Sequence, residues 1–255
     1  MTSTTDPRYN MNFHPLKALK ATFAFTKNKE DTSQVFRIMS ALDGGQSEKN
    51  FQRFKTTPAG GAVLAEKRSL YEALCDRDYL RQCPEDSLGR AYLDFVSREG
   101  LSPEGFQAEI EAADEELSHI SEDRIINRMR LRHAHDLWHV MTGYGRDAIG
   151  EAALLGFTYA QIRVLGFAYL GTVVSLNIKG QFSGMPVFAC FREGYELGKR
   201  AGWLMGADWE NLFHLPLEEV RAQFNIGIPA QYLAIADRAA ARDLELREEL
   251  AGAAA

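Results

Sequence analysis

Apolar residues in this chain recur at intervals of three and four positions, with little of the alternation typical of strands, so the pattern predicts helices. Ser33 is predicted to cap the first of them, and Ser87 and Ser102 precede two others. Residues 57–61, which contain Pro58 and two glycines, are predicted to form a loop. The predicted helices cover 33–42, 62–80, 88–98 and 103–117, followed by one that begins at Asp123.

No internal repeat, low-complexity run or interdomain linker divides this series of predicted helices. The 255 residues are 45% hydrophobic, which is enough for a substantial core. We therefore expect an all-α fold, with a single multi-helix domain over 31–235 and an N-terminal segment over 1–30. Residues 236–255 are expected to form a charged, alanine-rich helix or tail.

The stretch 152–178 is the most apolar part of the chain and carries one charged residue, Arg163. Its longest uncharged run, Val164 to Ile178, is 15 residues long. A membrane-spanning helix needs about 20 apolar residues, so we expect a buried helix here rather than a span.

The segment 13–29 mixes apolar residues with lysines, a composition typical of a short basic amphipathic helix. Two interpretations stay open: a surface helix that packs on the core, or a helix that contacts an anionic membrane surface. The residues concerned are Phe13, Leu16, Leu19, Phe23 and Phe25, with Lys17, Lys20, Lys27 and Lys29.

The net charge and the cysteine content indicate which binding partners and which cellular compartments the protein can have. The net charge of −6 argues against nucleic acid as the main partner, because phosphate binding needs a basic surface. The three cysteines include no C-x-x-C pair, which fits a reducing compartment and no disulfide framework. The first residues lack the apolar run of a secretory signal. We expect a cytoplasmic protein, with peripheral contact to the inner face of the membrane as an option and a homo-oligomeric state.

Four residues form a candidate metal site: His135, Asp136, His139 and Glu151. On a helix the first three fall within an arc of about 100° and roughly 6 Å along the axis, so their side chains can converge on one ion. Glu151 lies twelve residues beyond His139, roughly 18 Å along an unbroken helix, so the chain must reverse direction. Glycines in between admit such a reversal. We therefore predict a helix, a glycine-rich loop and a second helix with Glu151 near its start.

The candidate ligands border the apolar stripe of the helix that carries them. Ile126, Met129, Leu137 and Val140 define this stripe, and the three ligand candidates flank it. His133 lies within the stripe, so we interpret it as a core or supporting histidine rather than a fifth ligand.

Glycines recur every fourth residue after Pro186, at Gly194, Gly198, Gly202 and Gly206, beside Phe188, Phe191 and Tyr195. Each glycine in a helix interior costs about 0.5–1 kcal/mol relative to alanine, so a compensating role is expected. Either another helix approaches closely, or the glycines leave a slot for a long apolar ligand. On the second interpretation the residues that contact the lipid would be Gly198, Gly202, Phe191 and Tyr195.

The spacing His-Asp, two residues, His, eleven residues, Glu resembles the metal motif of the coenzyme Q biosynthesis protein four family, and residues 135–151 match it without a gap. Residues 215–221 with 225–229, and 89–95, resemble further parts of that family. The likeness extends over roughly 50–230 and is most specific over 128–155.

This resemblance implies an all-α ubiquinone biosynthesis protein that acts on a polyprenylated 4-hydroxybenzoate-type lipid. The implied reaction is metal-dependent oxidative decarboxylation, in which a ring carboxyl is replaced by hydroxyl. Two imidazoles and two carboxylates suit Zn²⁺ best, with Fe²⁺ or Mn²⁺ as alternatives. The rival interpretation is a non-enzymatic lipid-binding scaffold that organises other quinone biosynthesis proteins around a structural metal. A third interpretation is that this protein is a relative of the family that acts in another lipid or pigment pathway.

Overall fold

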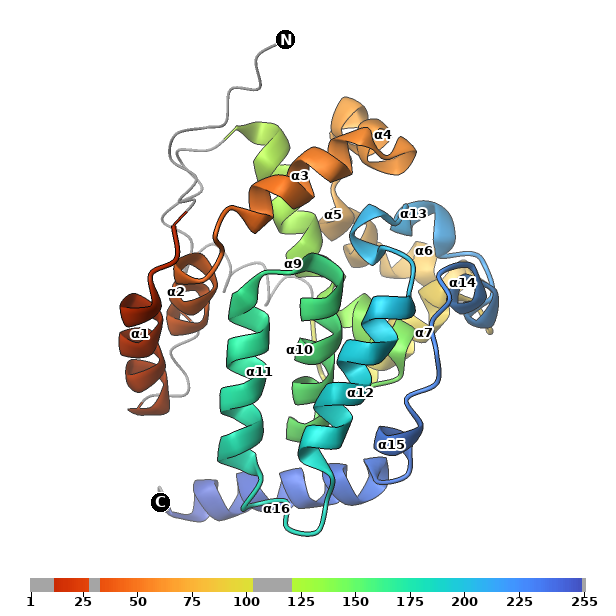
Figure 1. The fold of residues 1–255 in the computed structure, drawn as a ribbon. Coiled ribbons are helices and arrows are strands. Elements are labelled where there is room, and N and C mark those ends of the chain that lie inside the picture. Colours follow the sequence, from red (N-terminus) through yellow and green to blue (C-terminus); the bar gives the residue numbers. More distant parts are fainter. Residues whose placement is uncertain (1–11, 28–32, 103–120, 254–255) are drawn as a thin grey trace.

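The structure is a computed structural model that describes residues 12–27, 33–102 and 121–253 (Figure 1). Within these ranges it contains helices and no β-strand, only an isolated bridge between Ser87 and Pro216, so the all-α prediction is confirmed. The helices are α1 (Pro15–Lys27), α2 (Ser33–Ala41), α3 (Gln46–Thr56), α4 (Pro58–Glu66), α5 (Leu70–Cys75), α6 (Arg77–Gln82), α7 (Leu88–Arg98), α9 (Glu122–Thr142), α10 (Ala148–Ile162), α11 (Leu165–Ile178), α12 (Val187–Arg200), η2 (Leu204–Gly206), α13 (Trp209–Leu212), α14 (Leu217–Gln223), α15 (Ala230–Leu233) and α16 (Ala236–Ala253).

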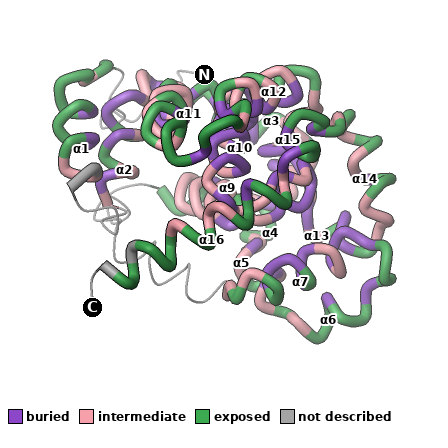
Figure 2. The backbone as a smooth tube through the Cα atoms, turned by 90° about the horizontal axis from the view of Figure 1, so that it is seen from below, coloured by how far each residue is buried: buried purple, intermediate pink, exposed green. Residues whose placement is uncertain are grey.

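Helix α10 lies at the centre of the fold and contacts α9, α11 and α12 (Figures 1 and 2). Eleven of its residues are buried, because its sequence is apolar on every side rather than along one stripe. Helices α1 and α2 pack together beside α11, and α16 runs across the lower ends of α10, α11 and α12 in Figure 1. Helix α16 therefore packs on the core, and its Ala239 is fully buried.

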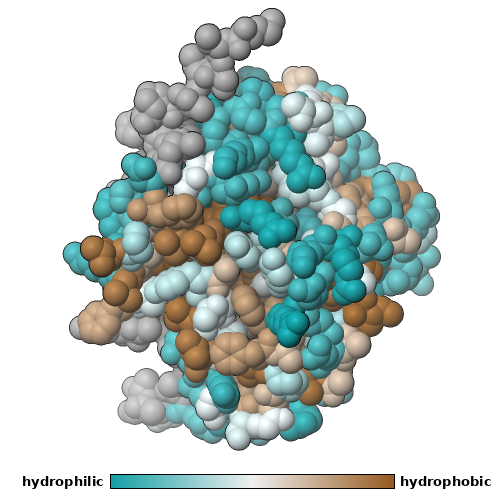
Figure 3. Space-filling model, viewed as in Figure 1, coloured by the Kyte–Doolittle hydropathy of each residue, from teal (hydrophilic) through white to brown (hydrophobic). Residues whose placement is uncertain are grey.

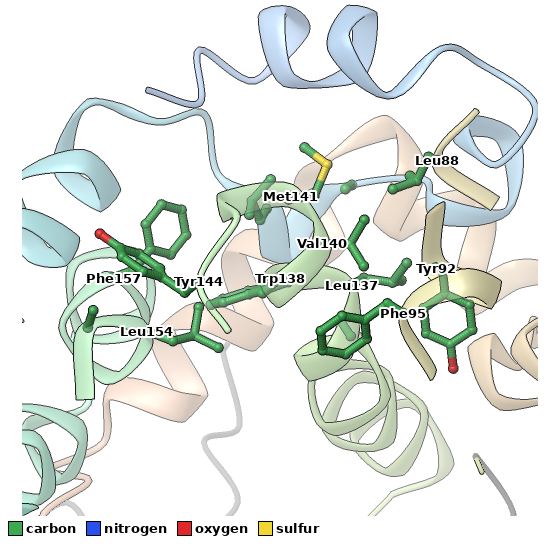
Figure 4. Close-up of a cluster of buried hydrophobic side chains, with 14 of the residues drawn as sticks. Leu88, Tyr92, Phe95, Leu137, Trp138, Val140, Met141, Tyr144, Leu154 and Phe157 are labelled. Atoms are coloured by element: carbon green, nitrogen blue, oxygen red, sulfur yellow. The ribbon is translucent and has the colours of Figure 1, made fainter. Parts of the chain in front are cut away.

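The main core lies between α7, α9 and α10 (Figure 4). Leu137 and Trp138 of α9 are buried in it, and the Trp138 ring meets Phe157 of α10 edge-on, with centroids 6.0 Å apart. Phe95 reaches the same cluster from α7. The predicted apolar stripe of α9 is thus the face that packs, which leaves its flank free for polar side chains.

The prediction of one buried helix over 152–178 is wrong in two respects. Arg163 adopts a left-handed conformation, with φ of 59°, and separates α10 from α11. Helix α11 is also only partly buried, since Leu165 and Leu176 are 42% and 62% exposed. Among the described residues, no helix is long and apolar enough to cross a membrane.

The helix boundaries predicted from capping residues are confirmed at α7, where the Ser87 hydroxyl accepts the N–H of Arg90. The predicted loop over 57–61 is wrong: Thr57 caps α4, Pro58 is its first residue, and both glycines lie within it. The prediction of a single helix over 62–80 is also wrong, because the structure divides this stretch among the end of α4, all of α5 and the start of α6. The helix predicted over 103–117 lies outside the described residues.

The predicted glycine series does not lie on one helix. Helix α12 ends at Arg200, so Gly202 and Gly206 follow it rather than extend its face. Gly194 and Gly198 face the backbone of α10: a Cβ on Gly194 would lie 2.0 Å from the carbonyl oxygen of Ala153. At these two positions the glycines admit a neighbouring helix, the first of the two explanations offered by the sequence.

Helix α9 is held at both ends by arginines. Near its start, Arg124 forms a bidentate ion pair with Glu48 of α3, and Arg130 pairs with Glu210 through atoms 2.6 Å apart. At its end, Arg221 of α14 donates to the carbonyl oxygens of Val140 and Met141, at 2.8 and 3.0 Å. Because the last carbonyls of a helix lack partners within it, the guanidinium caps α9 just beyond His139.

Candidate metal site

Three of the four candidate ligands converge. His135 and His139 lie on α9, Glu151 lies in the first turn of α10, and one ligand atom from each falls within 4.8 Å of the others. Nε2 of His139 is 3.5 Å from Oε1 of Glu151, and Nε2 of His135 is 3.8 Å from Oε2. The predicted helix, loop and second helix are therefore present, with Glu151 near the start of α10.

Asp136 borders this group without belonging to it. Its Oδ1 lies 3.4 Å from Nδ1 of His135, whose Nε2 faces Glu151. A carboxylate in this position fixes the orientation of the imidazole and raises its basicity as a ligand. The structure thus brings Asp136 to the site as a residue that orients His135, and direct ligation by Asp136 stays a prediction.

His139 is the most constrained member of the group. Its side chain is fully buried, its ring stacks on Phe95 with centroids 5.6 Å apart, and its Nδ1 lies 2.9 Å from the carbonyl oxygen of Tyr144. A carbonyl only accepts, so Nδ1 carries a proton, and in the neutral ring Nε2 then offers its lone pair. Nε2 is buried and makes no hydrogen bond. An unpaired buried nitrogen costs about 1–3 kcal/mol, and a metal ion between His139 and Glu151 would satisfy it.

The loop between the two helices is set by capping at both ends. Gly143 ends α9 with φ of 78°, and its N–H donates to the carbonyl oxygen of His139. Asp147 begins α10, and its Oδ1 accepts the N–H groups of Ile149 and Gly150, both at 3.1 Å. The carboxylate of Glu151 then lies near the positive end of the α10 dipole.

The electrostatics favour an ionised carboxylate among the histidines. Burial raises the pKa of Glu151, but His139, His135 and Arg146 outweigh it and hold that pKa below its ordinary value. Burial lowers the pKa of His135, but the carboxylates of Asp136 and Glu151 outweigh it and hold that pKa above the ordinary value of a histidine. An ionised carboxylate therefore faces two imidazoles, which are donor types that a divalent cation accepts.

His133 belongs to the core, in agreement with its place in the apolar stripe. It is buried, and its ring lies 5.2 Å from that of Tyr71. Burial, together with the charge of Arg132, lowers its pKa to about 4, so it is neutral at physiological pH. It does not join the group of converging ligand atoms.

Two cavities bear on the predicted ligand sites. One, of about 210 Å³, lies beside His139 and is lined by Phe95, Val140 and Tyr144, which Figure 4 labels, and by Arg98. The other, of about 490 Å³, borders Gly198 and Gly202 at the far end of α10. Its charged lining residues are all basic: Lys49, Arg53, Arg163 and Lys199.

The residues predicted to contact a lipid tail are thus near a polar cavity rather than an apolar slot. At Gly198 a Cβ would lie 2.7 Å from the carbonyl oxygen of Phe157, and at Gly202 it would lie 3.1 Å from Phe224. Phe191 and Tyr195 are half-buried, and the Tyr195 ring stacks on Tyr159. Lipid contact by these four residues stays a prediction.

Comparison with known proteins identifies the family. The sequence model described as coenzyme Q (ubiquinone) biosynthesis protein Coq4 matches residues 14–230. The chain belongs to the Coq4 family. The resemblance noted in the metal motif is therefore confirmed at the level of the family and of its part in ubiquinone biosynthesis.

Two curated relatives of this chain are named as ubiquinone biosynthesis proteins of the Coq4 type. The mitochondrial ubiquinone biosynthesis protein of Meyerozyma guilliermondii is 28% identical over 68% of this chain and 53% of its own length. That of Talaromyces stipitatus is 26% identical over 68% of this chain and 58% of its own length. The chain thus spans little more than half the length of these relatives. Their names place them in mitochondria, and the cytoplasmic location expected from the sequence stays a prediction.

A solved structure supports the Coq4 fold. A Nostoc punctiforme protein named for ubiquinone biosynthesis superposes with a TM-score of 0.57, covering 85% of this chain and all of that one. The two are 22% identical, so this likeness concerns the fold alone.

Sequence reasoning missed three residues of the candidate metal site. Arg146 has its Nε 3.9 Å from Glu151, Phe95 stacks on His139, and Tyr232 hydrogen-bonds the loop between the ligands. Arg146 lies five residues before Glu151 in the sequence, so a positive charge near this candidate ligand could have been predicted. Phe95 and Tyr232 reach the site from α7 and α15, and no local pattern signals such contacts.

Proposed function

We propose that this protein binds a divalent metal at His135, His139 and Glu151 and replaces a ring carboxyl by hydroxyl on a polyprenylated 4-hydroxybenzoate-type lipid. The observation that carries the proposal is the buried Nε2 of His139, which has no hydrogen-bond partner and faces the Glu151 carboxylate at 3.5 Å. Membership of a ubiquinone biosynthesis family supports the class of substrate.

The donor set limits the metal and its open positions. Two imidazoles and one carboxylate fit Zn²⁺ in catalytic sites and also Fe²⁺ in oxygen-using enzymes, and Mn²⁺ accepts the same donors. With three protein ligands, even a tetrahedral ion keeps one position for water or substrate. When bound, such an ion would polarise a substrate oxygen, and iron or manganese would also supply redox chemistry that zinc lacks.

Residues next to the candidate ligands orient the two imidazoles and line the adjacent cavity. Asp136 holds the His135 ring, and the carbonyl of Tyr144 binds Nδ1 of His139 and so turns its Nε2 toward the site. The cavity of about 210 Å³ beside His139 has aromatic and aliphatic walls and Arg98 among its lining residues. An aromatic ring with a carboxylate matches this combination of an apolar wall and a cation.

The test of the proposed reaction uses purified protein loaded separately with Zn²⁺, Fe²⁺ or Mn²⁺. A 4-hydroxybenzoate with a short prenyl chain and a ¹³C-labelled carboxyl is supplied with oxygen as the oxidant. We expect release of labelled CO₂, a product with hydroxyl in place of the carboxyl, and one hydrogen peroxide per turnover, because oxygen takes up the two electrons that the oxidation releases. Fe²⁺ or Mn²⁺ should be more active than Zn²⁺. If ligand variants stay folded and still support quinone production in cells, a scaffold with a dispensable metal is the better account.

The proposal includes contact with an anionic membrane through α1. In this helix the small residues face the interior and the large apolar residues face outward, the reverse of an ordinary surface helix. Ala18 and Ala21 are 1% and 5% exposed. The exposed fractions of Leu16, Leu19 and Phe23 are 81%, 60% and 63%. Figure 3 shows apolar side chains gathered on the side of the molecule where α1 and α2 lie. Large apolar side chains on a soluble surface indicate an interaction site.

The charge of α1 favours a membrane over a second copy of the chain. Lys17, Lys20 and Lys27 lie in α1, which has no acidic residue, although the chain as a whole carries a net charge of −6. Self-association through this face would bring like charges together, whereas anionic lipid headgroups attract them by about 1 kcal/mol per lysine. The lipid substrate also resides in a membrane.

Co-sedimentation with vesicles tests the membrane contact. We expect binding to phosphatidylcholine vesicles that contain phosphatidylglycerol and weaker binding without it. Replacement of Leu16 and Leu19 by glutamine should lower the partition coefficient by about a hundredfold or more, because each leucine inserted contributes on the order of 1.5–3 kcal/mol. Leu244→Gln, which alters an exposed leucine on α16, is the matched control and should change nothing. A dimer in solution that these changes dissociate would instead assign the face to self-association.

A further inference from the structure

A phenol from the C-terminal part of the chain closes the loop between the metal ligands. The hydroxyl of Tyr232, in α15, accepts the N–H of Gly145 at 2.9 Å and donates to the carboxylate of Asp147. Tyr232 is 3% exposed, and its own backbone is fixed by Glu193 of α12, whose carboxylate accepts the N–H groups of Gln231 and Tyr232.

The two loop residues that Tyr232 contacts lead directly to the ligands. Asp147 caps α10 through Ile149 and Gly150, and its carbonyl oxygen accepts the N–H of Glu151 at 2.9 Å. Gly145 follows Tyr144, whose carbonyl oxygen meets Nδ1 of His139. One hydroxyl therefore joins the segment that orients His139 to the segment that places Glu151.

The loop has no space in which to relax. A Cβ on Gly145 would lie 2.4 Å from the Tyr232 hydroxyl, and a Cβ on Gly150 would lie 2.2 Å from the carbonyl oxygen of Gly145. The backbone of the loop is thus pressed between α10 and the Tyr232 ring. A hydrogen bond in such a packed position constrains geometry more than one at the surface.

We propose that Tyr232 is a positioning residue of the metal site, which sets the separation of His139 and Glu151 by holding Gly145 and Asp147 together. The inference rests on the proposed metal site and deepens it. Loss of the hydroxyl removes the two hydrogen bonds that tie Gly145 to Asp147 and leaves a gap beside the loop, so an ion must then order the ligands as it binds, which lowers its affinity and distorts its coordination.

The experiment compares Co²⁺ binding in wild type and Tyr232→Phe, followed by the visible absorption of the bound ion. We expect the dissociation constant to rise by about 10–100-fold, the effect typical of partners that orient ligands, and the absorption spectrum to shift. Tyr169→Phe is the matched control, because it also removes a hydrogen-bonded phenol hydroxyl, one that pairs with Thr22 of α1 at 3.0 Å rather than with the loop. The control should bind Co²⁺ as wild type does, with the same spectrum.

A second variant separates positioning from general stability. Asp147→Asn keeps an oxygen to cap α10 but removes the carboxylate that accepts from Tyr232, so it should weaken Co²⁺ binding in the same direction and shift the spectrum. A purely structural role would lower the melting temperature of the metal-free protein without altering that spectrum. Equal affinities and identical spectra in wild type and both variants overturn the positioning role alone. A wild type that binds no Co²⁺ overturns the proposed metal site and this inference with it.

Discussion

Replacement of His139 by alanine is expected to abolish stoichiometric metal binding. The imidazole is fully buried, its Nδ1 is fixed by the Tyr144 carbonyl, and its Nε2 is left facing Glu151. The substitution removes a ligand that is already held in the binding orientation, and it leaves the Glu151 carboxylate facing an empty space. Changes to residues that only orient ligands reduce affinity by about 10–100-fold, so loss of this ligand should exceed that range. Elemental analysis of the purified protein and a Co²⁺ titration measure the effect.

The control for this experiment is another buried histidine on the same helix. His133→Ala removes an imidazole of similar burial that does not converge on the site, so it matches the loss of packing without the loss of a ligand. It should lower stability and leave metal content unchanged. Full metal retention in a His135→Ala, His139→Ala double variant would exclude the site altogether.

The candidate site was largely predictable because helix geometry is local. The spacing of His135 and His139 places both on one flank of a helix, and the distance to Glu151 requires a reversal. The structure has that reversal between α9 and α10. What spacing could not decide is which carboxylate faces the Nε2 atoms of the two histidines: Glu151 does, whereas Asp136 lies beside Nδ1 of His135. That choice depends on side-chain direction and on how two helices pack.

The errors in the fold come from residues whose effect depends on tertiary context. Gly60 and Gly61 resemble a loop, yet Pro58 and the Thr57 cap start a helix that contains them. Arg163 gives no local sign of a left-handed conformation, which usually selects glycine, so one long helix was predicted where two exist. Composition alone also could not reveal that the leucines of α1 face outward.

Gly194→Ala should destabilise the protein, although alanine is the better helix former. Helix propensity favours the change by about 1 kcal/mol. Against it, the new Cβ would lie 2.0 Å from the carbonyl oxygen of Ala153, a backbone atom that cannot move without shifting α10. Overpacking of a well-packed interior costs about 1–3 kcal/mol, and a backbone contact this close lies at the upper end of that range. The overpacking term should therefore exceed the gain in propensity.

The matched control has the same substitution in a helix with free space around the glycine. Gly61 lies within α4, and the nearest atom to a Cβ there is the carbonyl oxygen of Lys55, at 3.8 Å. Gly61→Ala should therefore stabilise the protein by about 0.5–1 kcal/mol through helix propensity alone. Urea denaturation of the two variants compares them directly, and the free energies of unfolding should change in opposite directions. A Gly194→Ala protein at least as stable as Gly61→Ala would mean that α10 and α12 are not in close contact, and would restore a slot for a ligand between them.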